Sequence, residues 1–240
     1  MTSKASPVLV ERQANILAAV VREYIQTAEP VGSQTLVERY FFEVSPATIR
    51  NDMAALEEGG YLESPHHSAG RVPTDQSYRY YVRHFLRPTE LSTREEQELK
   101  SLVGDPSTAG AGLKLVARAV ASYSSESAFL AFGKTEVYHT GFARLFQQPE
   151  FREFQQISDL GAIIDQFDEV VESVFEEIPD EVVVMVGSEN PFGEACSVIV
   201  GRFEASALGA GLFGMLGPTR MDYDTNLTRV KYVHDLLDTL

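Results

Sequence analysis

The sequence is poor in cysteine, with one residue of this type among 240. A single thiol, Cys196, excludes a disulfide framework and a zinc site built from several cysteines, and it suits a reducing compartment. Long apolar runs are also missing: no stretch approaches the ~20 residues of a membrane-spanning helix, and residues 1–13 lack the apolar core of a secretory signal. We therefore expect a cytoplasmic protein with no membrane partner.

Cations are scarce as well, and their deficit is uneven. Lys and Arg total 20 against 35 Asp and Glu, a formal net charge of −15. Residues 1–90 carry nine cations and eleven anions, a net charge of −2, whereas residues 91–240 carry eleven and twenty-four, a net charge of −13. Because affinity for duplex DNA comes largely from neutralising phosphates, a nucleic-acid site must place its cations locally, in the first part.

The first 88 residues have the element order of a winged helix-turn-helix. Apolar periodicity, turn residues and capping residues predict helices over 11–26, 33–40 and 46–58, strands at 61–63 and 71–73, and a helix after Thr74. Ser33 and Ser45 are the candidate N-caps of the second and third helices. Pro46 stands at a first helical position, where its missing N–H costs nothing.

The helix predicted over 46–58 has the composition of a DNA-reading helix. At about 100° per residue, its larger apolar side chains fall on one side: Ile49, Met53 and Leu56. The opposite side carries alanines around Asn51, flanked by Thr48 and Arg50. Little bulk lets a helix enter the major groove, where Asn matches adenine and Arg matches guanine or a phosphate. The alternative is a plain solvent-facing helix, which the neighbouring short helix and hairpin make less favoured.

Four further residues are candidate DNA contacts. Ser33 and Ser45, at helix starts, would direct backbone N–H groups at phosphates. Arg71 in the wing and Arg79 on the next helix would contact phosphates through their guanidinium groups. For Arg79 the alternative is a solvated face, because arginines recur four and eight residues beyond it.

No metal, cofactor or catalytic site is expected. The adjacent His66 and His67 lack a cysteine or a third histidine nearby, so they are a poor ligand set. Cys196 lies in an apolar run without an evident histidine partner, which is typical of a core residue. A P-loop, a dinucleotide fingerprint and a metal motif are all missing from the sequence. We therefore do not expect an enzyme.

The remainder is predicted as a helical linker, 89–126, and a second α+β domain, 127–240. Helices are expected over 93–103, 113–123, 159–177 and 226–240, and strands over 127–132, 136–138, 181–186, 196–203 and 208–216. The last strand is rich in glycine, which is typical of bulges or close backbone approach. Such a strand could also line a small-molecule pocket.

Six stretches together resemble the HrcA family of heat-inducible transcription repressors. They are PVGS at 30–33, SPATIRNDMA at 45–54, SAGRVPT at 68–74, QPEF at 148–151, GSENP at 187–191 with Cys196-Ser197 after it, and GPTRMDY at 217–223. The resemblance implies a homodimeric repressor of chaperone genes in the heat-shock stress response. Such a repressor binds an inverted-repeat operator in double-stranded DNA, its activity depends on a GroEL-type chaperonin, and its second domain resembles a GAF fold that dimerises.

This sequence departs from the family pattern in its middle. The region 87–141 is too short to hold both the start of a GAF-like domain and the family's inserted dimerisation segment, so the mode of dimerisation stays open. His67 stands where the family usually has threonine, and Gln76-Ser77 replaces a glycine-containing pair. The alternative function keeps the DNA-binding part and makes the second domain a sensor of a small molecule.

Overall fold

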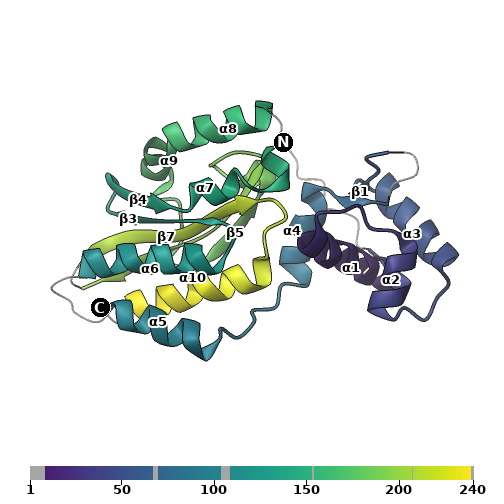
Figure 1. The fold of residues 1–240 in the computed structure, drawn as a ribbon, viewed down its shortest axis with the longest axis horizontal. Coiled ribbons are helices and arrows are strands. Elements are labelled where there is room, and N and C mark those ends of the chain that lie inside the picture. Colours follow the sequence, from purple (N-terminus) through teal and green to yellow (C-terminus); the bar gives the residue numbers. More distant parts are fainter. Residues whose placement is uncertain (1–8, 67–69, 104–108, 153, 207, 239–240) are drawn as a thin grey trace. The chain divides into compact units, whose positions relative to one another are not determined.

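The computed structural model describes residues 9–66, 70–103, 109–152, 154–206 and 208–238. They form two units, Met1–Phe85 and Leu86–Leu240, here the N-terminal and the C-terminal unit (Figure 1). Both contain helices and strands, so the predicted α+β class is confirmed. Across the described ranges, every helix is too short or too polar to cross a bilayer.

The N-terminal unit consists of helices and one small hairpin. Its elements are α1 (Glu11–Thr27), α2 (Ser33–Tyr40), α3 (Pro46–Glu58), β1 (Leu62–Glu63), β2 (Val72–Pro73) and α4 (Asp75–His84). The strands pair antiparallel, with Leu62 opposite Pro73. Three helices followed by a hairpin is the order that the sequence predicts, and each boundary lies within one residue of its expected place.

A single apolar core holds these helices together. Its fully buried members come from every helix-turn-helix element: Ile16, Leu17 and Val20 of α1, Leu36 of α2, Ile49 and Leu56 of α3, and Leu62 of β1. The spacing of three or four residues on α1 and α3 places these side chains on one face of each helix. The core therefore leaves the opposite face of α3 free of packing.

The two predicted N-caps have different outcomes. Ser45 is confirmed, because its hydroxyl accepts a hydrogen bond from the Thr48 backbone N–H at 3.2 Å. For α2 the prediction is wrong: Gly32 is the N-cap, with extended backbone, and Ser33 is the first helical residue, 8% exposed. The Leu36 N–H already bonds to the Gly32 carbonyl, so the helix begins one residue earlier than a serine cap would place it.

The C-terminal unit is built on a five-stranded sheet in the order β4-β3-β7-β6-β5, antiparallel throughout. The strands are β3 (Ser127–Phe132), β4 (Glu136–Thr140), β5 (Val183–Val186), β6 (Cys196–Ala205) and β7 (Gly209–Pro218). The helices are α5 (Thr93–Val103), α6 (Ala109–Tyr123), α7 (Phe142–Leu145), α8 (Phe154–Asp165), α9 (Phe167–Val174) and α10 (Tyr223–Leu237).

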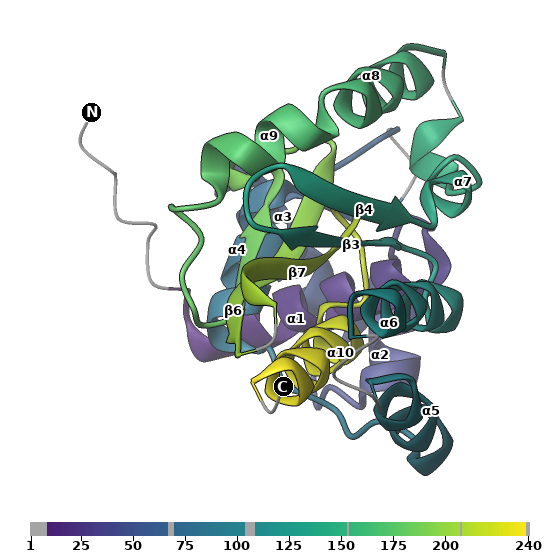
Figure 2. The ribbon, with the colours of Figure 1, turned by 90° about the vertical axis from the view of Figure 1, so that its left-hand side faces the viewer.

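Helices cover both faces of this sheet. Figures 1 and 2 show α6 and α10 on one face, with α5 outside them, and α8 and α9 on the other. Both α5 and α6 lie within the stretch predicted as a linker, and they pack in the C-terminal unit: α5 against α6, and α6 against β3.

Phenylalanines dominate the core under α9. The ring of Phe167 lies 5.2 Å from that of Phe129 and 4.8 Å from that of Phe192, centroid to centroid. Cys196 belongs to the same core; it is fully buried, and burial raises the pKa of its thiol to about 12. Its place agrees with the prediction of a core cysteine.

Several helices of the C-terminal unit differ from the sequence prediction: α6 begins at Ala109 rather than at 113, and α7 was not predicted. The helix expected over 159–177 is divided into α8 and α9, which meet at Gln166. The apolar stripe continues across this break from Leu160 to Phe167 and Val171, all buried, so periodicity alone does not reveal it. The last helix begins at Tyr223 because the Asp222 carboxylate caps it, accepting from the Thr225 N–H at 3.1 Å.

Candidate nucleic-acid interface

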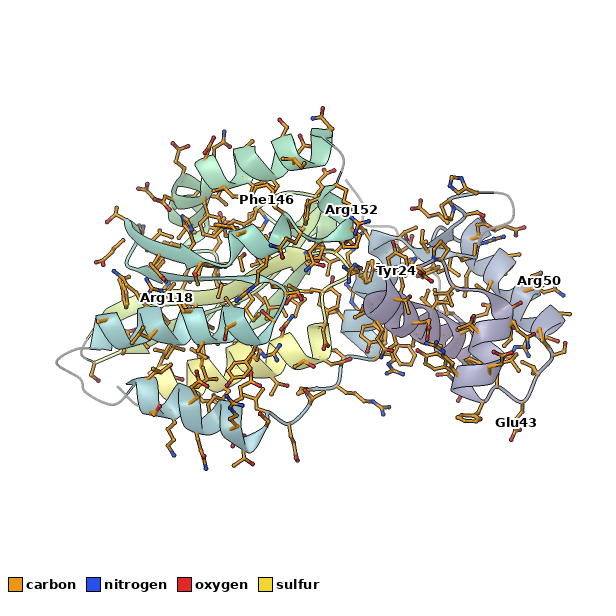
Figure 3. All side chains as sticks on the ribbon, viewed as in Figure 1. Tyr24, Glu43, Arg50, Arg118, Phe146 and Arg152 are labelled. Carbon is orange, nitrogen blue, oxygen red and sulfur yellow. The ribbon has the colours of Figure 1, made fainter. Side chains whose placement is uncertain are left out.

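The two faces of α3 are as the helical periodicity predicts. Ile49 and Leu56 are buried, at 0% and 1% exposure. Arg50 and Asn51 are exposed, and Thr48 is half-buried beside them. Figure 3 shows Arg50 extending from the outer face of the helix, away from the body of the unit. The exposed face is thus one guanidinium and one amide among alanines, a surface of low bulk with hydrogen-bonding groups at its centre.

The start of α3 is fixed by its own polar side chains. The Ser45 hydroxyl lies 3.0 Å from the Thr48 hydroxyl, in addition to accepting from the Thr48 N–H. Both hydroxyls are therefore held at the first turn, where the positive end of the helix dipole attracts anions. Both are placed to meet a ligand that approaches this end of the helix.

A carboxylate inside the same motif orients the helix. Asp52 is 7% exposed, and it receives two hydrogen bonds from Arg12 of α1, at 2.7 Å from Nε and 3.2 Å from Nη2. A bidentate pair fixes direction as well as distance, so the roll of α3 against α1 is set here. Sequence reasoning missed this pair, although Asp52 falls beside the core side of the helix at 100° per residue.

A second buried carboxylate performs the same task for α2. Glu23 of α1 is 4% exposed and lies 2.5 Å from Nη1 of Arg39. The Tyr40 hydroxyl donates to its other oxygen at 3.4 Å. Burial raises the pKa of Tyr40, and the nearby charge of Glu23 raises it further. The helix α2 is thereby tied to α1 through Arg39 and Tyr40.

The wing, which is the hairpin of β1 and β2 with the residues between them, is joined to α3 and to the segment before α2. Arg71 donates from Nε to Glu57 of α3 at 2.9 Å and from Nη1 to the Ser64 hydroxyl at 3.2 Å. Its backbone forms an isolated antiparallel bridge with Val31, with both N–H···O distances at 2.9 Å. A Cβ at Gly70 would lie 2.3 Å from the Val31 carbonyl oxygen, so this bridge requires glycine at position 70.

The remaining predicted contacts are more scattered. Arg79 is on α4 and lies 3.9 Å from Asp75. Ser33 has a buried side chain, so only its backbone at the start of α2 is suited to a ligand. His66 is exposed, while His67 lies outside the described residues. The structure brings Ser45, Thr48, Arg50 and Asn51 together on α3, links Arg71 to that helix through Glu57, and leaves Arg79 on a separate element. Within the described ranges, no three His, Cys, Asp or Glu side chains gather as a metal site would require.

The three family-like stretches of the C-terminal unit, at 148–151, 187–191 and 217–223, form turns held by side-chain hydrogen bonds. Arg220 of the GPTRMDY stretch pairs with Glu150 of the QPEF stretch, and its Nη2 donates to the Gln148 side chain at 2.7 Å. In GSENP, the Asn190 amide closes its own turn, accepting from the Phe192 N–H at 3.1 Å and donating to the Gly193 carbonyl. These motifs therefore maintain the fold of this unit.

At two glycines of β7, the strand considered as the wall of a pocket, core aromatic rings occupy the space that a side chain would fill. A Cβ at Gly211 would lie 2.3 Å from the Phe203 ring, and one at Gly214 would lie 2.6 Å from the Phe129 ring. These glycines make room for aromatic core residues. A cavity of about 250 Å³ lies elsewhere, beside the edge strand β5, with walls that include Val174, Met185 and Pro191 and with Glu177 and Glu189 among its polar residues.

Comparisons with known proteins fit these observations. The family described as "HrcA protein C terminal domain" matches residues 79–226. A "Heat-inducible transcription repressor HrcA" of Carboxydothermus hydrogenoformans is 27% identical over 333 aligned positions, covering 96% of this chain and 97% of that protein. One of Pelotomaculum thermopropionicum is 57% identical over 91 residues, 38% of this chain and 26% of the relative. The longer alignment exceeds this chain's 240 residues, so that relative contains a segment that this chain lacks.

A solved structure supports the fold across both units. The crystal structure of a hypothetical protein matches with a TM-score of 0.80 and 21% identity, covering 97% of this chain and 98% of that one. The family match spans more than half of the chain and includes most of the C-terminal unit, and the named relatives are regulators of transcription. The chain therefore belongs to the HrcA family.

Proposed function

We propose that this protein represses transcription of heat-shock genes by binding an inverted-repeat operator as a homodimer in the cytoplasm. The observation that carries the proposal is the exposed face of α3, where Arg50 and Asn51 stand among alanines on a helix whose roll is fixed by Asp52. The names of the relatives, heat-inducible transcription repressors, supply the kind of gene controlled. We assign no enzymatic activity to the chain.

Each candidate residue has a part in this proposal. Asn51, Arg50 and Thr48 contact bases or their immediate surroundings in the major groove. Ser45 and Ser33 present the N-terminal ends of α3 and α2 to phosphates, in the case of Ser33 through backbone N–H groups. A third group, Arg71 and Arg79, neutralises phosphates. For Arg71 this means sharing its guanidinium between a phosphate and Glu57, which it contacts at 2.9 Å in the free protein.

Two copies are needed because one reading unit has little charge with which to hold DNA. The first 90 residues carry a net charge of −2, so few phosphates are neutralised by each copy. A twofold dimer doubles the contacts, and it matches half-sites spaced about one helical turn, or a multiple of it, apart. We assign DNA reading to residues 1–88 and dimerisation to 127–240; residues 89–126, predicted as a linker, contain α5 and α6, which pack in the C-terminal unit.

Regulation by a GroEL-type chaperonin completes the proposal, in keeping with the family resemblance. When misfolded proteins occupy the chaperonin on heating, less of it is free to maintain the active repressor. Measuring operator binding with and without added chaperonin tests this step. Equal occupancy of the operator in both arms would exclude it.

The central test is Asn51→Ala in the full chain. We expect binding to an operator selected from random duplexes by the wild-type protein to be lost, while the circular dichroism spectrum and the unfolding midpoint stay unchanged. Asn15→Ala is the matched control, because Asn15 is an exposed asparagine on α1. Unchanged affinity of a folded Asn51→Ala protein would overturn the proposal.

The cavity of about 250 Å³ beside β5 favours a second candidate function, in which the C-terminal unit senses a small molecule. Its mixed apolar and acidic lining is compatible with an organic ligand. A thermal-shift screen of metabolites against wild type and Met185→Trp, which fills the cavity, separates this candidate from the first. A ligand that stabilises only the wild type supports it.

A further inference from the structure

The turn between α2 and α3 exposes an aromatic residue in an unfavourable backbone conformation. Phe41, the C-cap of α2, is 86% exposed and has φ 53° and ψ 38°. Among described residues other than glycine, it shares positive φ with Ala28 alone. A side chain with a Cβ disfavours this left-handed region, and glycine or asparagine is the usual choice at such a helix end.

The fold gains nothing evident from this ring. The next residue, Phe42, is half-buried and packs against the core of the N-terminal unit, as Tyr40 does. Phe41 does neither, so it combines backbone strain with apolar surface left in water. A residue that costs stability in two ways and is not part of the core is typical of a binding surface.

Its position is beside the DNA-reading helix. Phe41 precedes Ser45, the N-cap of α3, by four residues. Figure 3 shows Glu43, in the same turn, and Arg50 of α3 both extending outward from the N-terminal unit. A helix whose N-terminal turn enters the major groove brings the turn before it to the rim of that groove.

We propose that Phe41 is a further DNA-contacting residue whose ring packs on an apolar group of the duplex, a thymine methyl or a deoxyribose face. The inference rests on the proposed operator binding. The charges near the turn favour an apolar contact over an ionic one: Glu43 in the turn is exposed, and Glu38 of α2 accepts a hydrogen bond from Gln34 at 2.7 Å. The neighbouring cation, Arg39 of α2, is paired with Glu23 at 2.5 Å. Two carboxylates repel phosphates, whereas a phenyl ring gives affinity that salt does not screen.

The test compares Phe41→Gly with Phe41→Tyr in the full chain, on the operator selected by the wild type. We expect Phe41→Gly to weaken binding by roughly tenfold, the factor that corresponds to about 1.4 kcal/mol, with an unchanged slope against log salt. Its unfolding midpoint should be unchanged or higher, because glycine relieves the left-handed conformation. Phe41→Tyr retains the ring and should bind as the wild type does. Phe41→Asn, which also tolerates this conformation, replaces Phe41→Gly if the glycine variant fails to fold.

A comparison of two duplexes, one with thymine and one with uracil, identifies the DNA group that Phe41 contacts. Replacing thymine by uracil removes the methyl groups; a loss of affinity in the wild type but not in Phe41→Gly assigns the contact to a methyl, and no loss in either assigns it to the sugar. The proposal is overturned if Phe41→Gly binds as tightly as the wild type, or if Phe41→Tyr loses as much as Phe41→Gly. Asn51→Ala in the same assay separates the two hypotheses. If Asn51→Ala still binds the operator, the proposed operator reading by α3 is wrong. If Asn51→Ala loses binding while Phe41→Gly binds as the wild type does, only the proposed role of Phe41 is wrong.

Discussion

The two units of this chain have apolar cores of different composition, and each contains ion pairs with buried carboxylates. In the N-terminal unit, buried carboxylates tie helices to one another: Asp52 joins α3 to α1, and Glu23 joins α2 to α1. In the C-terminal unit, phenylalanines in stacked and edge-to-face pairs fill the space between sheet and helices, and the buried carboxylate of Glu95 in α5 pairs with Arg229 of α10 at 2.8 Å. Ion pairs fix the orientation of a helix more sharply than apolar packing does, because hydrogen bonds are directional. In the N-terminal unit, one such pair holds α3, the helix whose exposed face carries Arg50 and Asn51.

The two units also differ in net charge. Between Arg152 and Arg202 the sequence has twelve Asp and Glu and neither Lys nor Arg. Many of these carboxylates lie on α8, α9 and the segment after them, where they are exposed. Such a surface repels nucleic acid, so the C-terminal unit is unsuited to bind DNA with this face. The acidity of the whole chain is therefore compatible with DNA binding by its first part.

The largest effect is expected from opening the phenylalanine core. Phe167 is 1% exposed and its ring contacts those of Phe129, Phe142 and Phe192. Phe167→Ala should cost about 3–5 kcal/mol, seen as faster hydrogen exchange across residues 86–240 in the full chain. Phe146→Ala, at a 38% exposed position, is the control and should change little. Equal loss of protection in residues 1–85 would show that the two units unfold together.

Gly70→Ala should destabilise the N-terminal unit by roughly 1–3 kcal/mol, the usual cost of overpacking. The added Cβ would lie 2.3 Å from the Val31 carbonyl oxygen and force the bridge to Arg71 apart. The same substitution at Gly161 in α8 meets open space and should stabilise its helix slightly. Urea unfolding of both variants measures the change in the free energy of unfolding. A change of the same sign in both would contradict the close approach of Gly70 to the Val31 carbonyl.

Asp52→Asn removes a charge from the pair that sets the roll of α3. Arg12 is half-exposed, so solvent screens the pair and only a modest fall in the unfolding midpoint is expected, smaller at high salt. Operator affinity should fall as well, because α3 is held less firmly. Glu58→Gln makes the same charge change at an exposed site of α3 and should not lower affinity. If Glu58→Gln and Asp52→Asn behave alike, charge rather than orientation explains the effect.

The smallest expected effect depends on pH. Glu126 is 6% exposed, and burial raises its pKa above the ordinary 4.5, against the opposing hydrogen bond of Ser124. Above pH 4.5 the unfolded chain releases this proton while the folded chain keeps it, so the stabilising contribution is lost as pH rises through the folded pKa. Glu126→Gln should therefore gain stability relative to the wild type on going from pH 4 to 7 in urea titrations. Glu90→Gln, at an exposed site, is the control, and a difference independent of pH would refute the raised pKa.

Much of the fold was predictable because its signals are local. Helical spacing and punctuation by Pro, Gly and Ser locate α1, α2, α3 and α5 to within one residue. The division of α8 from α9 was not predictable, since the apolar stripe runs through it. The interior position of Ser33 likewise depends on where the backbone of Gly32 turns into the helix, which side-chain type alone does not determine.

The candidate site was predictable to the same extent. The exposure of Arg50 and Asn51 follows from periodicity, because a core on one side of α3 leaves the other side in water. Periodicity does not predict the partners of Asp52 and Arg71. Arg12 precedes Asp52 by 40 residues, and Val31 precedes Arg71 by 40 residues. Phe41 shows the limit most clearly: it and Phe42 are the same residue type in one turn, and only the structure shows that Phe41 is exposed, with a left-handed backbone, while Phe42 packs on the core.

The buried thiol of Cys196 has a practical consequence for studying this molecule. With 0% exposure and a pKa of about 12, it should resist maleimide reagents at neutral pH. A cysteine introduced at an exposed site, such as Asn15 or Glu98, would then be the one that accepts a spin label or a fluorophore, without removal of the native residue. Label pairs in one chain report the distance between its units, on and off DNA. Under the proposed dimerisation, labels placed singly in each copy report the separation of the two DNA-binding units.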